Sequence, residues 1–188
     1  MQHKYRTEAL VLSRQPVKEH DASVALLTAD FGIIRARAGG LRKQGSKMAA
    51  GLQTLTESNV ALIRAKDGWR LAGAVALHSW THELASQSRM RFARVAELMQ
   101  RLSHGEESEP RLFDEATAFV RALRELPEDA QDGAECLAAL RILHILGHDA
   151  GELPGGFCTY DDASLSALEG DRKAYINRIN TGIGASGL

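Results

Sequence analysis

The sequence predicts an α+β fold in which a small five-stranded β-barrel is followed by an α-helical bundle. Five strand-like runs occupy the first 80 residues, and from about residue 79 the apolar residues recur every three or four positions. Residues 1–80 carry 12 Lys or Arg against 6 Asp or Glu, whereas residues 81–188 carry 11 against 18. We therefore expect two domains, residues 1–78 and 79–188, that have different partners.

The first three expected strands cover residues 5–13, 23–29 and 33–38, which are rich in strand-forming side chains. Turn-forming residues follow the first run at residues 14–16, where Arg-Gln-Pro predicts that the strand ends. Asp30-Phe31-Gly32 separates the second run from the third and is short enough for a hairpin.

The third run alternates strictly between apolar and basic side chains. Ile34, Ala36 and Ala38 fall on one face of a strand, and Arg35 and Arg37 fall on the other. Because the side chains of a strand alternate between its two faces, this pattern predicts a half-buried strand whose exposed face is cationic.

Residues 55–65 and 69–77 form two further strand-like runs, and Lys66-Asp67-Gly68 connects them. Asp-Gly in such a short connection is a strong hairpin signal. Five strands at this spacing fit the OB-fold, a closed barrel that binds oligonucleotides across a strand face and its adjoining loops. The predicted fold is therefore an OB-fold β-barrel followed by a helical domain.

The basic segment, residues 35–53, contains five cationic residues and no acidic one. It turns through Gly39-Gly40 and continues into a loop with Gly, Ser and Lys. Such a loop suits a phosphate backbone, because phosphate binding needs only positioned cations. The alternative is a solvated loop whose charges aid solubility. The candidate phosphate contacts are Arg35, Arg37, Arg42, Lys43 and Lys47.

The first domain offers three aromatic rings for base stacking, those of Tyr5, Phe31 and Trp69. Phe31 follows Asp30 at a turn, where packing into the core competes with a role as a stacking platform. Trp69 begins a strand and is open to the same two interpretations. We expect backbone electrostatics to contribute more than base stacking.

The three- and four-residue spacing beyond residue 79 predicts an acidic antiparallel helical bundle. A last helix is expected at residues 165–179, followed by a frayed tail at 181–188. Before it, one amphipathic helix or a pair of helices is expected from about residue 79 to 102. Two further helices are expected at residues 112–126 and from residue 132 or 133 to Gly147.

Several functional classes find little support in the residues. No apolar run approaches the roughly 18 residues of a membrane span. Cys136 and Cys158 form neither a CxxC pair nor a disulfide framework, and two histidine pairs at a spacing of four lack converging ligands. We expect a cytoplasmic, nucleoid-associated protein that is not an enzyme and has no metal, cofactor or membrane partner.

Three segments carry a more specific signal. Residues 8–32 read EALVLSRQPVKEHDASVALLTADFG, residues 35–53 read RARAGGLRKQGSKMAAGLQ, and residues 140–147 read LRILHILG. In this order they resemble the RecO family of DNA repair proteins. The resemblance covers residues 1 to about 150, and the order of the three motifs makes it more specific than any one of them.

The resemblance implies a recombination mediator with an OB-fold, a helical domain and no catalytic centre. RecO-like proteins bind single- and double-stranded DNA and anneal complementary strands. They contact the C-terminal tail of the single-strand-binding protein (SSB), and with RecR they help to load RecA on SSB-coated single-stranded DNA.

The resemblance also implies which residues serve these roles. It makes the five cations of the basic segment the expected DNA contacts. It places Arg141 on the segment of the third helix that helps to form the SSB-tail surface. An Arg that holds a carboxylate beside an apolar pocket suits such an acidic tail, so the candidates for a docking groove are Phe92, Leu98 and Arg141. The alternative is that the acidic helices present only a solvated face.

The sequence departs from the family pattern in three respects. Many members carry a four-cysteine zinc site after the third helix, and here only Cys158 lies in that region, so no zinc is expected. The chain also ends earlier than expected for the family. Gly39 stands where a Lys commonly precedes the second glycine, which removes one expected charge.

Two alternative functions remain. The first is an OB-fold protein that acts on RNA, since a cationic surface serves both nucleic acids and only ribose selectivity separates them. The second is an interaction scaffold in which the basic segment docks an acidic protein and never meets nucleic acid.

Overall fold

The computed structural model describes residues 3–17, 19–103 and 108–186. The chain divides into two compact units. The barrel unit comprises Met1–Glu83 with Gly105–Pro110, and the helical unit comprises Leu84–His104 with Arg111–Leu188. The expectation that the first part binds DNA and the second binds partners stays a prediction.

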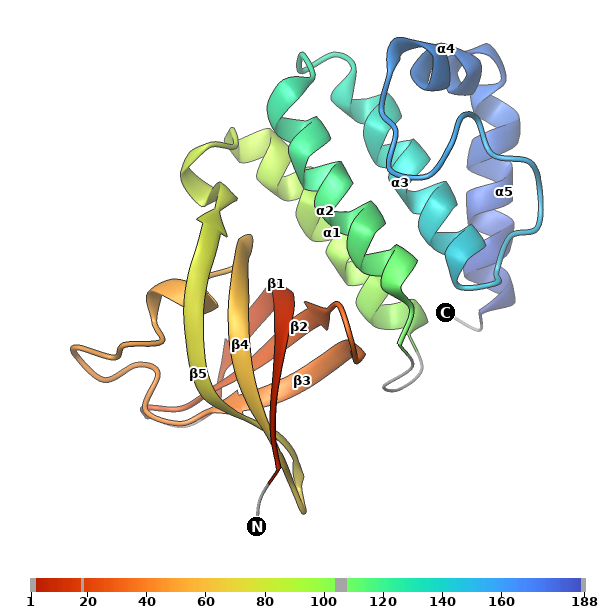
Figure 1. Cartoon of the computed structure of the whole chain (residues 1–188). Coiled ribbons are helices and arrows are strands. Elements are labelled where there is room, and N and C mark those ends of the chain that lie inside the picture. The colour runs from red at the N-terminus through yellow and green to blue at the C-terminus, as the bar shows by residue number, and fades with distance from the viewer. Residues whose placement is uncertain (1–2, 18, 104–107, 187–188) are drawn as a thin grey trace. The chain divides into compact units, whose positions relative to one another are not determined.

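The barrel unit is a closed barrel with the strand order β1-β2-β3-β5-β4 (Figure 1). A short parallel pairing of β3 with β5 closes it, and the other strand pairs are antiparallel. This confirms the predicted OB-fold. The strands are β1 (Lys4–Pro16), β2 (Ala22–Thr28), β3 (Gly32–Ala38), β4 (Thr56–Ala65) and β5 (Gly68–Ser79).

Strand β1 is longer than the sequence predicted. Its first half pairs with β4 and its second half with β2, and the register shifts between Val11 and Ser13. The predicted end before Arg14 was wrong, because pairing with β2 continues to Pro16 opposite Ala22. Proline lacks the N–H that a ladder hydrogen bond needs, and the pairing ends at this residue. The chain turns only afterwards, where Val17 N–H donates to Asp21 O at 3.1 Å.

The barrel core confirms the alternation in β3, with Ile34, Ala36 and Ala38 buried and Arg35 and Arg37 exposed. Full burial of an aliphatic side chain stabilises a fold by roughly 1.5–3 kcal/mol. This energy fixes the strand register, because a shift by one residue would turn both arginines into the core. The core also contains Val11, Val24, Leu26, Leu52, Val60, Leu62 and Leu71.

The connection between β3 and β4 extends away from the strands (Figure 1) and returns through a short 3-10 helix, η1 (Ala50–Leu52). Gly51 permits its close approach to β5, since a Cβ there would lie 3.1 Å from the Ala74 carbonyl carbon. Ser58 Oγ donates to Gly51 O at 2.6 Å, and Leu52 is fully buried. This end of the basic segment is therefore anchored.

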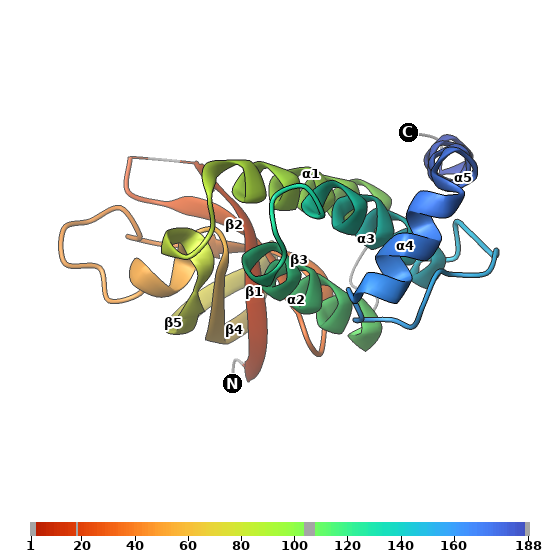
Figure 2. The ribbon, with the colours of Figure 1, turned by 90° about the horizontal axis from the view of Figure 1, so that it is seen from above.

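The helical unit confirms the predicted helical bundle. Helix α3 lies between α1 and α2 on one side and α4 and α5 on the other (Figures 1 and 2). Its position explains why α3 is buried on nearly all sides. The helices are α1 (Ser86–Leu102), α2 (Pro110–Glu125), α3 (Gln131–Ile145), α4 (Asp162–Gly170) and α5 (Arg172–Ala185).

Several predicted helix boundaries were wrong. Helix α1 begins only at Ser86, because a 3-10 turn, η2 (Trp80–His82), follows β5 and buries Trp80. The expected last helix is two helices, separated where Asp171 leaves the helical conformation after Gly170, a poor helix former. Helix α5 then continues to Ala185 instead of fraying from residue 181. The predicted break at residues 104–110 falls mostly outside the described residues.

Candidate nucleic-acid interface

Strand β3 presents the first two candidate DNA contacts on the outer face of the barrel. The side chains of Arg35 and Arg37 point outward because their neighbours in the strand fill the core. The Arg37 side chain is 49% exposed. Its position pairs with Ser23 of β2 on one side and with Arg70 of β5 on the other.

The start of the basic segment is fastened to the connection between β1 and β2. Asp21 accepts from Arg37 Nη2 at 2.6 Å and Nε at 3.2 Å, and it also accepts from Gly40 N–H at 3.0 Å. Arg42 N–H donates to His20 O at 3.1 Å. The turn at Gly40, with φ +65°, is thus held by a side chain and by the backbone.

The remaining three candidates, Arg42, Lys43 and Lys47, lie exposed on the loop beyond this turn. Successive backbone hydrogen bonds, from Lys43 N–H to Gly40 O and from Ser46 N–H to Lys43 O, fold the loop into turns. Among the residues that the structure describes, no acidic side chain forms an ion pair with these three cations. Their charges are therefore available to an external anion.

The connection between β4 and β5 lines a surface hollow together with Arg37. We call it the cationic hollow. Lys66 and Arg70 stand in it beside Arg37, and the sequence did not predict them as contacts because they lie outside the basic segment. The signal was available, since the loop between strands 4 and 5 takes part in ligand binding by OB-folds. The hollow is lined by Asp21, Arg37, Gly39, Ala65, Lys66, Asp67, Trp69, Arg70 and Leu71.

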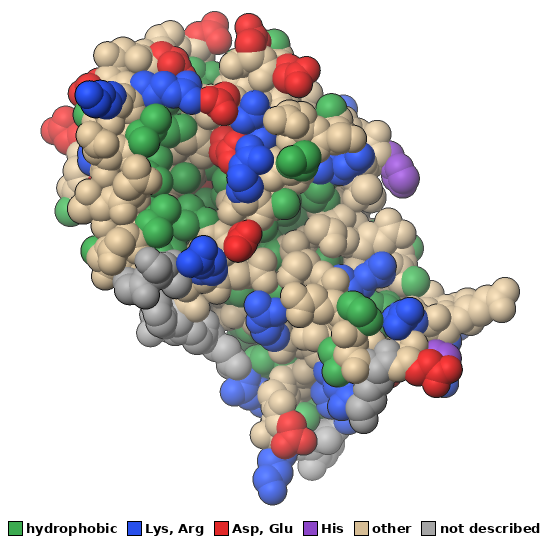
Figure 3. All heavy atoms as spheres, turned by 180° about the vertical axis from the view of Figure 1, so that it is seen from behind, with side chains coloured by type: hydrophobic (Ala, Val, Ile, Leu, Met, Phe, Trp, Pro, Cys, Tyr) green, Lys and Arg blue, Asp and Glu red, His purple; other side chains and the backbone are tan. Residues whose placement is uncertain are grey.

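The three aromatic rings of the barrel pack on one another. Tyr5 lies edge-on to Phe31 and to Trp69, with ring centroids 5.5 Å apart in each pair, and Phe31 lies 5.4 Å from Trp69. Trp69 is only 7% exposed, and Phe31 packs against the barrel core. This arrangement favours a packing role for Phe31 and Trp69 over base stacking. On the face shown in Figure 3, Lys and Arg side chains are spread over the barrel.

The three candidates for the SSB tail do not share a surface. Phe92 is 1% exposed and belongs to the core of the helical unit, and Arg141 is completely buried. Leu98 alone of the three lines a surface groove, and Figure 3 shows hydrophobic side chains gathered on the helical unit. The groove is lined by Arg94, Val95, Glu97, Leu98, Arg101, Glu135, Ala139, Ile179 and Ile183.

Arg141 already has internal partners. Its guanidinium donates to Glu115 Oε1 at 3.3 Å and to the carbonyl oxygens of Pro154 at 3.3 Å and Thr159 at 2.7 Å. Glu115, also fully buried, accepts from Tyr160 Oη at 2.6 Å. Burial and then the Glu115 carboxylate raise the pKa of Tyr160 well above its ordinary value. The pair thus fixes the segment after α3 against α2 and α3.

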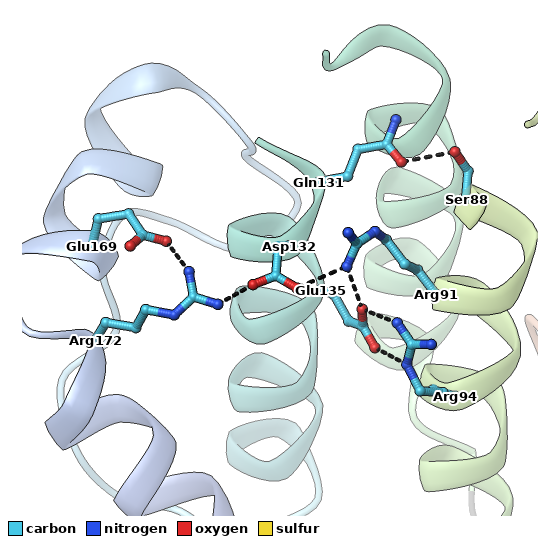
Figure 4. Close-up of polar contacts among 8 residues, drawn as sticks. All are labelled: Ser88, Arg91, Arg94, Gln131, Asp132, Glu135, Glu169 and Arg172. Carbon is cyan, nitrogen blue, oxygen red and sulfur yellow. Dashed lines mark hydrogen bonds and ion pairs between the residues drawn. The ribbon is translucent and has the colours of Figure 1, made fainter. Parts of the chain in front are cut away.

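Three other arginines of the helical unit join α1, α3, α4 and α5 in a chain of ion pairs (Figure 4). Arg91 bridges Asp132 at 2.8 Å and Glu135 at 3.0 Å, and Arg94 contacts Glu135 at 2.5 Å. Arg172 continues the chain from Asp132 to Glu169. Hydrogen bonds from Arg172 and then Arg91 hold the pKa of the Asp132 carboxyl below its ordinary value.

Within residues 3–17, 19–103 and 108–186, no helix is both long and apolar enough to cross a membrane. In the same ranges, His, Cys, Asp and Glu do not gather in groups of three or more that could hold a metal ion. The expectation that zinc is absent stays a prediction.

A closed five-stranded barrel of this topology belongs to the OB-fold class, whose members bind oligonucleotides or oligosaccharides. The model of the family described as "Recombination protein O N terminal" matches residues 1–74. The chain also resembles several curated proteins named DNA repair protein RecO. These matches confirm the resemblance to the RecO family that the sequence showed.

Three of these relatives show the extent of the similarity. The protein of Heliobacterium modesticaldum is 34% identical over 145 residues, which cover 77% of this chain and 52% of the relative. That of Dehalococcoides mccartyi is 30% identical over 130 residues, covering 69% and 50%. That of Gloeobacter violaceus is 27% identical over 165 residues, covering 87% and 62%. The chain spans about half the length of the first two.

Proposed function

We propose that this protein is a recombination mediator in DNA repair that binds single- and double-stranded DNA without sequence preference. In this role it anneals complementary strands and, with RecR, helps to load RecA on SSB-coated single-stranded DNA. The relatives named DNA repair protein RecO support the general role. The basic segment and the cationic hollow support the DNA contact, which has no need of a catalytic centre.

The observation that carries the proposal is the convergence of exposed cations on one part of the barrel. Arg35 and Arg37 come from β3, Arg42, Lys43 and Lys47 from the following loop, and Lys66 and Arg70 from β5 and the turn before it. Cations that contact phosphates displace condensed counterions, and this release favours binding at low salt. Phosphate contacts alone carry no sequence information, which agrees with non-specific binding.

Annealing follows from the same electrostatics. Two complementary strands repel each other through their phosphates, and partial neutralisation by a cationic surface lowers that repulsion. Because the aromatic rings are packed on one another, bases held on this surface remain open to pairing. A surface that binds the backbone and leaves the base edges free is suited to annealing.

The direct test is a fluorescence-anisotropy titration of labelled single-stranded DNA at several salt concentrations. It compares the wild type with a variant in which Arg35, Arg37, Arg42 and Lys43 are all changed to Ala. Each lost phosphate contact lowers the salt slope by roughly 0.7 for single strands, so the slope should fall by up to about 2.8.

A matched control removes four cations from the helical unit by changing Arg101, Arg121, Arg124 and Lys173 to Ala. This control has the same net charge as the barrel variant and should keep the wild-type slope. Equal losses in both variants would mean that net charge, and not the barrel surface, governs binding. Absence of wild-type binding at 50–100 mM salt would contradict the proposal, and tighter binding to RNA of the same sequence would favour the RNA alternative.

For the partners, we propose that the helical unit docks the SSB tail at the groove lined by Leu98, while RecR and RecA join the same pathway. An apolar floor from Leu98, Ile179 and Ile183 lies beside Arg101, which suits an acidic peptide that ends in an aromatic residue. In this proposal Arg101 takes the place of Arg141 as the residue that holds the carboxylate of the peptide, because the Arg141 guanidinium is buried.

The partner proposal is tested with a synthetic SSB tail peptide in an anisotropy titration. Leu98→Ser should weaken binding about fivefold or more, as expected for an apolar anchor. Met90→Ser is the matched control, because Met90 is an exposed apolar residue of the same helix and does not line the groove. Equal affinity of the Leu98 variant and the wild type would exclude this groove as the docking site.

A further inference from the structure

Asp21 occupies an unusual position for an acidic residue on a surface of cations. Its carboxylate stands within the cationic hollow, where one oxygen takes two hydrogen bonds from the Arg37 guanidinium and the other takes the Gly40 N–H. The Asp21 side chain is 21% exposed, against 49% for Arg37. The Asp21 carboxylate therefore occupies the Nε and Nη2 edge of the Arg37 guanidinium.

The groups around Asp21 are those that proteins use to bind phosphate. A guanidinium fork binds carboxylate and phosphate oxygens with the same geometry. Backbone N–H groups at tight turns form a second type of anion site, and Gly40 has the positive φ of such a turn. Arg70, at the position paired with Arg37 across the parallel strands, and Lys66 line the same hollow.

We propose that Asp21 is an internal substitute for a DNA phosphate, which occupies the Arg37 fork and the Gly40 N–H until the nucleic acid displaces it. This inference rests on the proposed DNA-binding function and adds a residue that sets its strength. In the free protein Asp21 keeps Arg37 ordered. On binding, a backbone phosphate takes the place of the carboxylate, with Arg70 and Lys66 as further contacts.

The Asp21 carboxylate should lower the affinity of the protein for DNA. A phosphate beside Arg37 must compete with a carboxylate that is covalently part of the protein, so Asp21 lowers DNA affinity below what the cations alone would give. Exposed ion pairs of this kind contribute modestly to stability. The competition therefore weakens binding without preventing it, which suits a protein that must release one strand to another.

The test uses Asp21→Asn, which removes the charge and keeps an oxygen that can accept from Gly40 N–H. We expect it to bind labelled single-stranded DNA about two- to fivefold more tightly than the wild type. The salt slope should stay close to the wild-type value, because Arg37 contacts a phosphate in both complexes and only the competition from the carboxylate is removed. Thermal unfolding of both proteins checks that the barrel remains folded.

The matched control is Asp67→Asn, because Asp67 lines the same hollow and has the same charge, whereas Arg37 forms its ion pair with Asp21. Loss of this charge should tighten binding less than Asp21→Asn does. In an Arg37→Ala background, the effect of Asp21→Asn should fall to the level of the Asp67 control. Equal effects of the two substitutions, or weaker binding by Asp21→Asn, would overturn the proposal and leave Asp21 a structural tie of the loop.

A second measurement separates this inference from the function on which it rests. Inorganic pyrophosphate is titrated into the isotopically labelled wild type and the Asp21→Asn variant, and the Gly40 amide and Arg37 Nε–H resonances are followed by NMR. The variant should respond at a lower pyrophosphate concentration than the wild type, even if the protein fails to bind DNA. Failure of wild-type DNA binding refutes the proposed function, whereas an unchanged pyrophosphate response in the variant refutes the role of Asp21.

Discussion

The arginines of the two units differ in what neutralises them. In the barrel unit, Arg35, Arg42 and Arg70 lie on the surface. In the helical unit, Arg141 and Arg91 are buried against carboxylates, and Arg178 is paired with Asp149. The same side chain is thus exposed on the surface of one unit and holds helices and loops together in the other.

The difference teaches that charge alone does not identify a binding residue. A buried arginine needs an internal carboxylate, because an unpaired charge in the interior costs several kcal/mol, on the order of the stability of a domain. Once that carboxylate is present, the guanidinium has little left for an external partner. An exposed arginine keeps its charge available, although salt screens it. The Arg37 guanidinium is intermediate between these two cases, because it is half exposed and is also paired with Asp21.

The largest expected effect comes from breaking the buried pair of the helical unit. Glu115→Gln leaves the Arg141 charge in the interior without its counter-charge, and should lower the free energy of unfolding by about 3–5 kcal/mol. Urea denaturation followed by circular dichroism measures the change. Since single-stranded DNA binds to the barrel in our proposal, the folded fraction of this variant should keep the wild-type salt slope.

The double variant Glu115→Gln with Arg141→Met sharpens the same comparison. It removes both charges, so the unpaired charge disappears and part of the lost stability should return. A double variant that is no more stable than Glu115→Gln alone would show that the pair's hydrogen bonds to the following segment matter more than its charges. A loss below about 1 kcal/mol in the single variant would contradict the structural role altogether.

A second prediction concerns how the stability contributed by the ion pair between Asp149 and Arg178 of α5 depends on pH. Arg178 donates to both carboxylate oxygens, at 3.0 and 2.6 Å, and these hydrogen bonds hold the pKa of Asp149 below its ordinary value. A lowered pKa in the folded state stabilises the protein above the unfolded pKa and ceases to do so as the carboxylate is protonated. Asp149→Asn should therefore cost about 1–3 kcal/mol at pH 7.

The difference between wild type and Asp149→Asn should shrink as the pH falls from about 5 toward 2, because both side chains are then uncharged. Denaturation curves at several pH values give this difference directly. A difference that stays constant across the range would mean that the carboxylate charge does not contribute. Asp162→Asn, at an exposed carboxylate in the first turn of α4, serves as a control with a smaller effect at every pH.

The smallest effect on stability is expected at the barrel surface. Arg70→Ala should change the free energy of unfolding by no more than about 0.5 kcal/mol, because its side chain is exposed. It should nevertheless lower the salt slope of single-stranded DNA binding by roughly 0.7. Arg121→Ala, at an exposed position of α2, should leave both quantities unchanged. If Arg70→Ala leaves the salt slope of DNA binding unchanged, Arg70 of β5 does not contact the DNA.

Local patterns in the sequence were sufficient for the barrel and for most of the helices. Alternation in β3 placed Arg35 and Arg37 on the outer face, and Asp67-Gly68 marked the turn between β4 and β5. Boundaries failed where distant contacts override local preference. Pairing with β2 carried β1 through Pro16, a position that turn chemistry alone had assigned to a turn.

By itself, the sequence determined the fold class, the order of the strands along the chain and the cationic character of the first part, because these depend on periodicity and composition over neighbouring residues. Only the tertiary structure decided which cations are available. Lys66 and Arg70 join Arg37 in one hollow through the parallel pairing of β3 and β5, and Arg141 is withdrawn into the core by Glu115 from another helix. The physical reason is that the environment of a charge is set by residues distant in the chain, which no local pattern encodes.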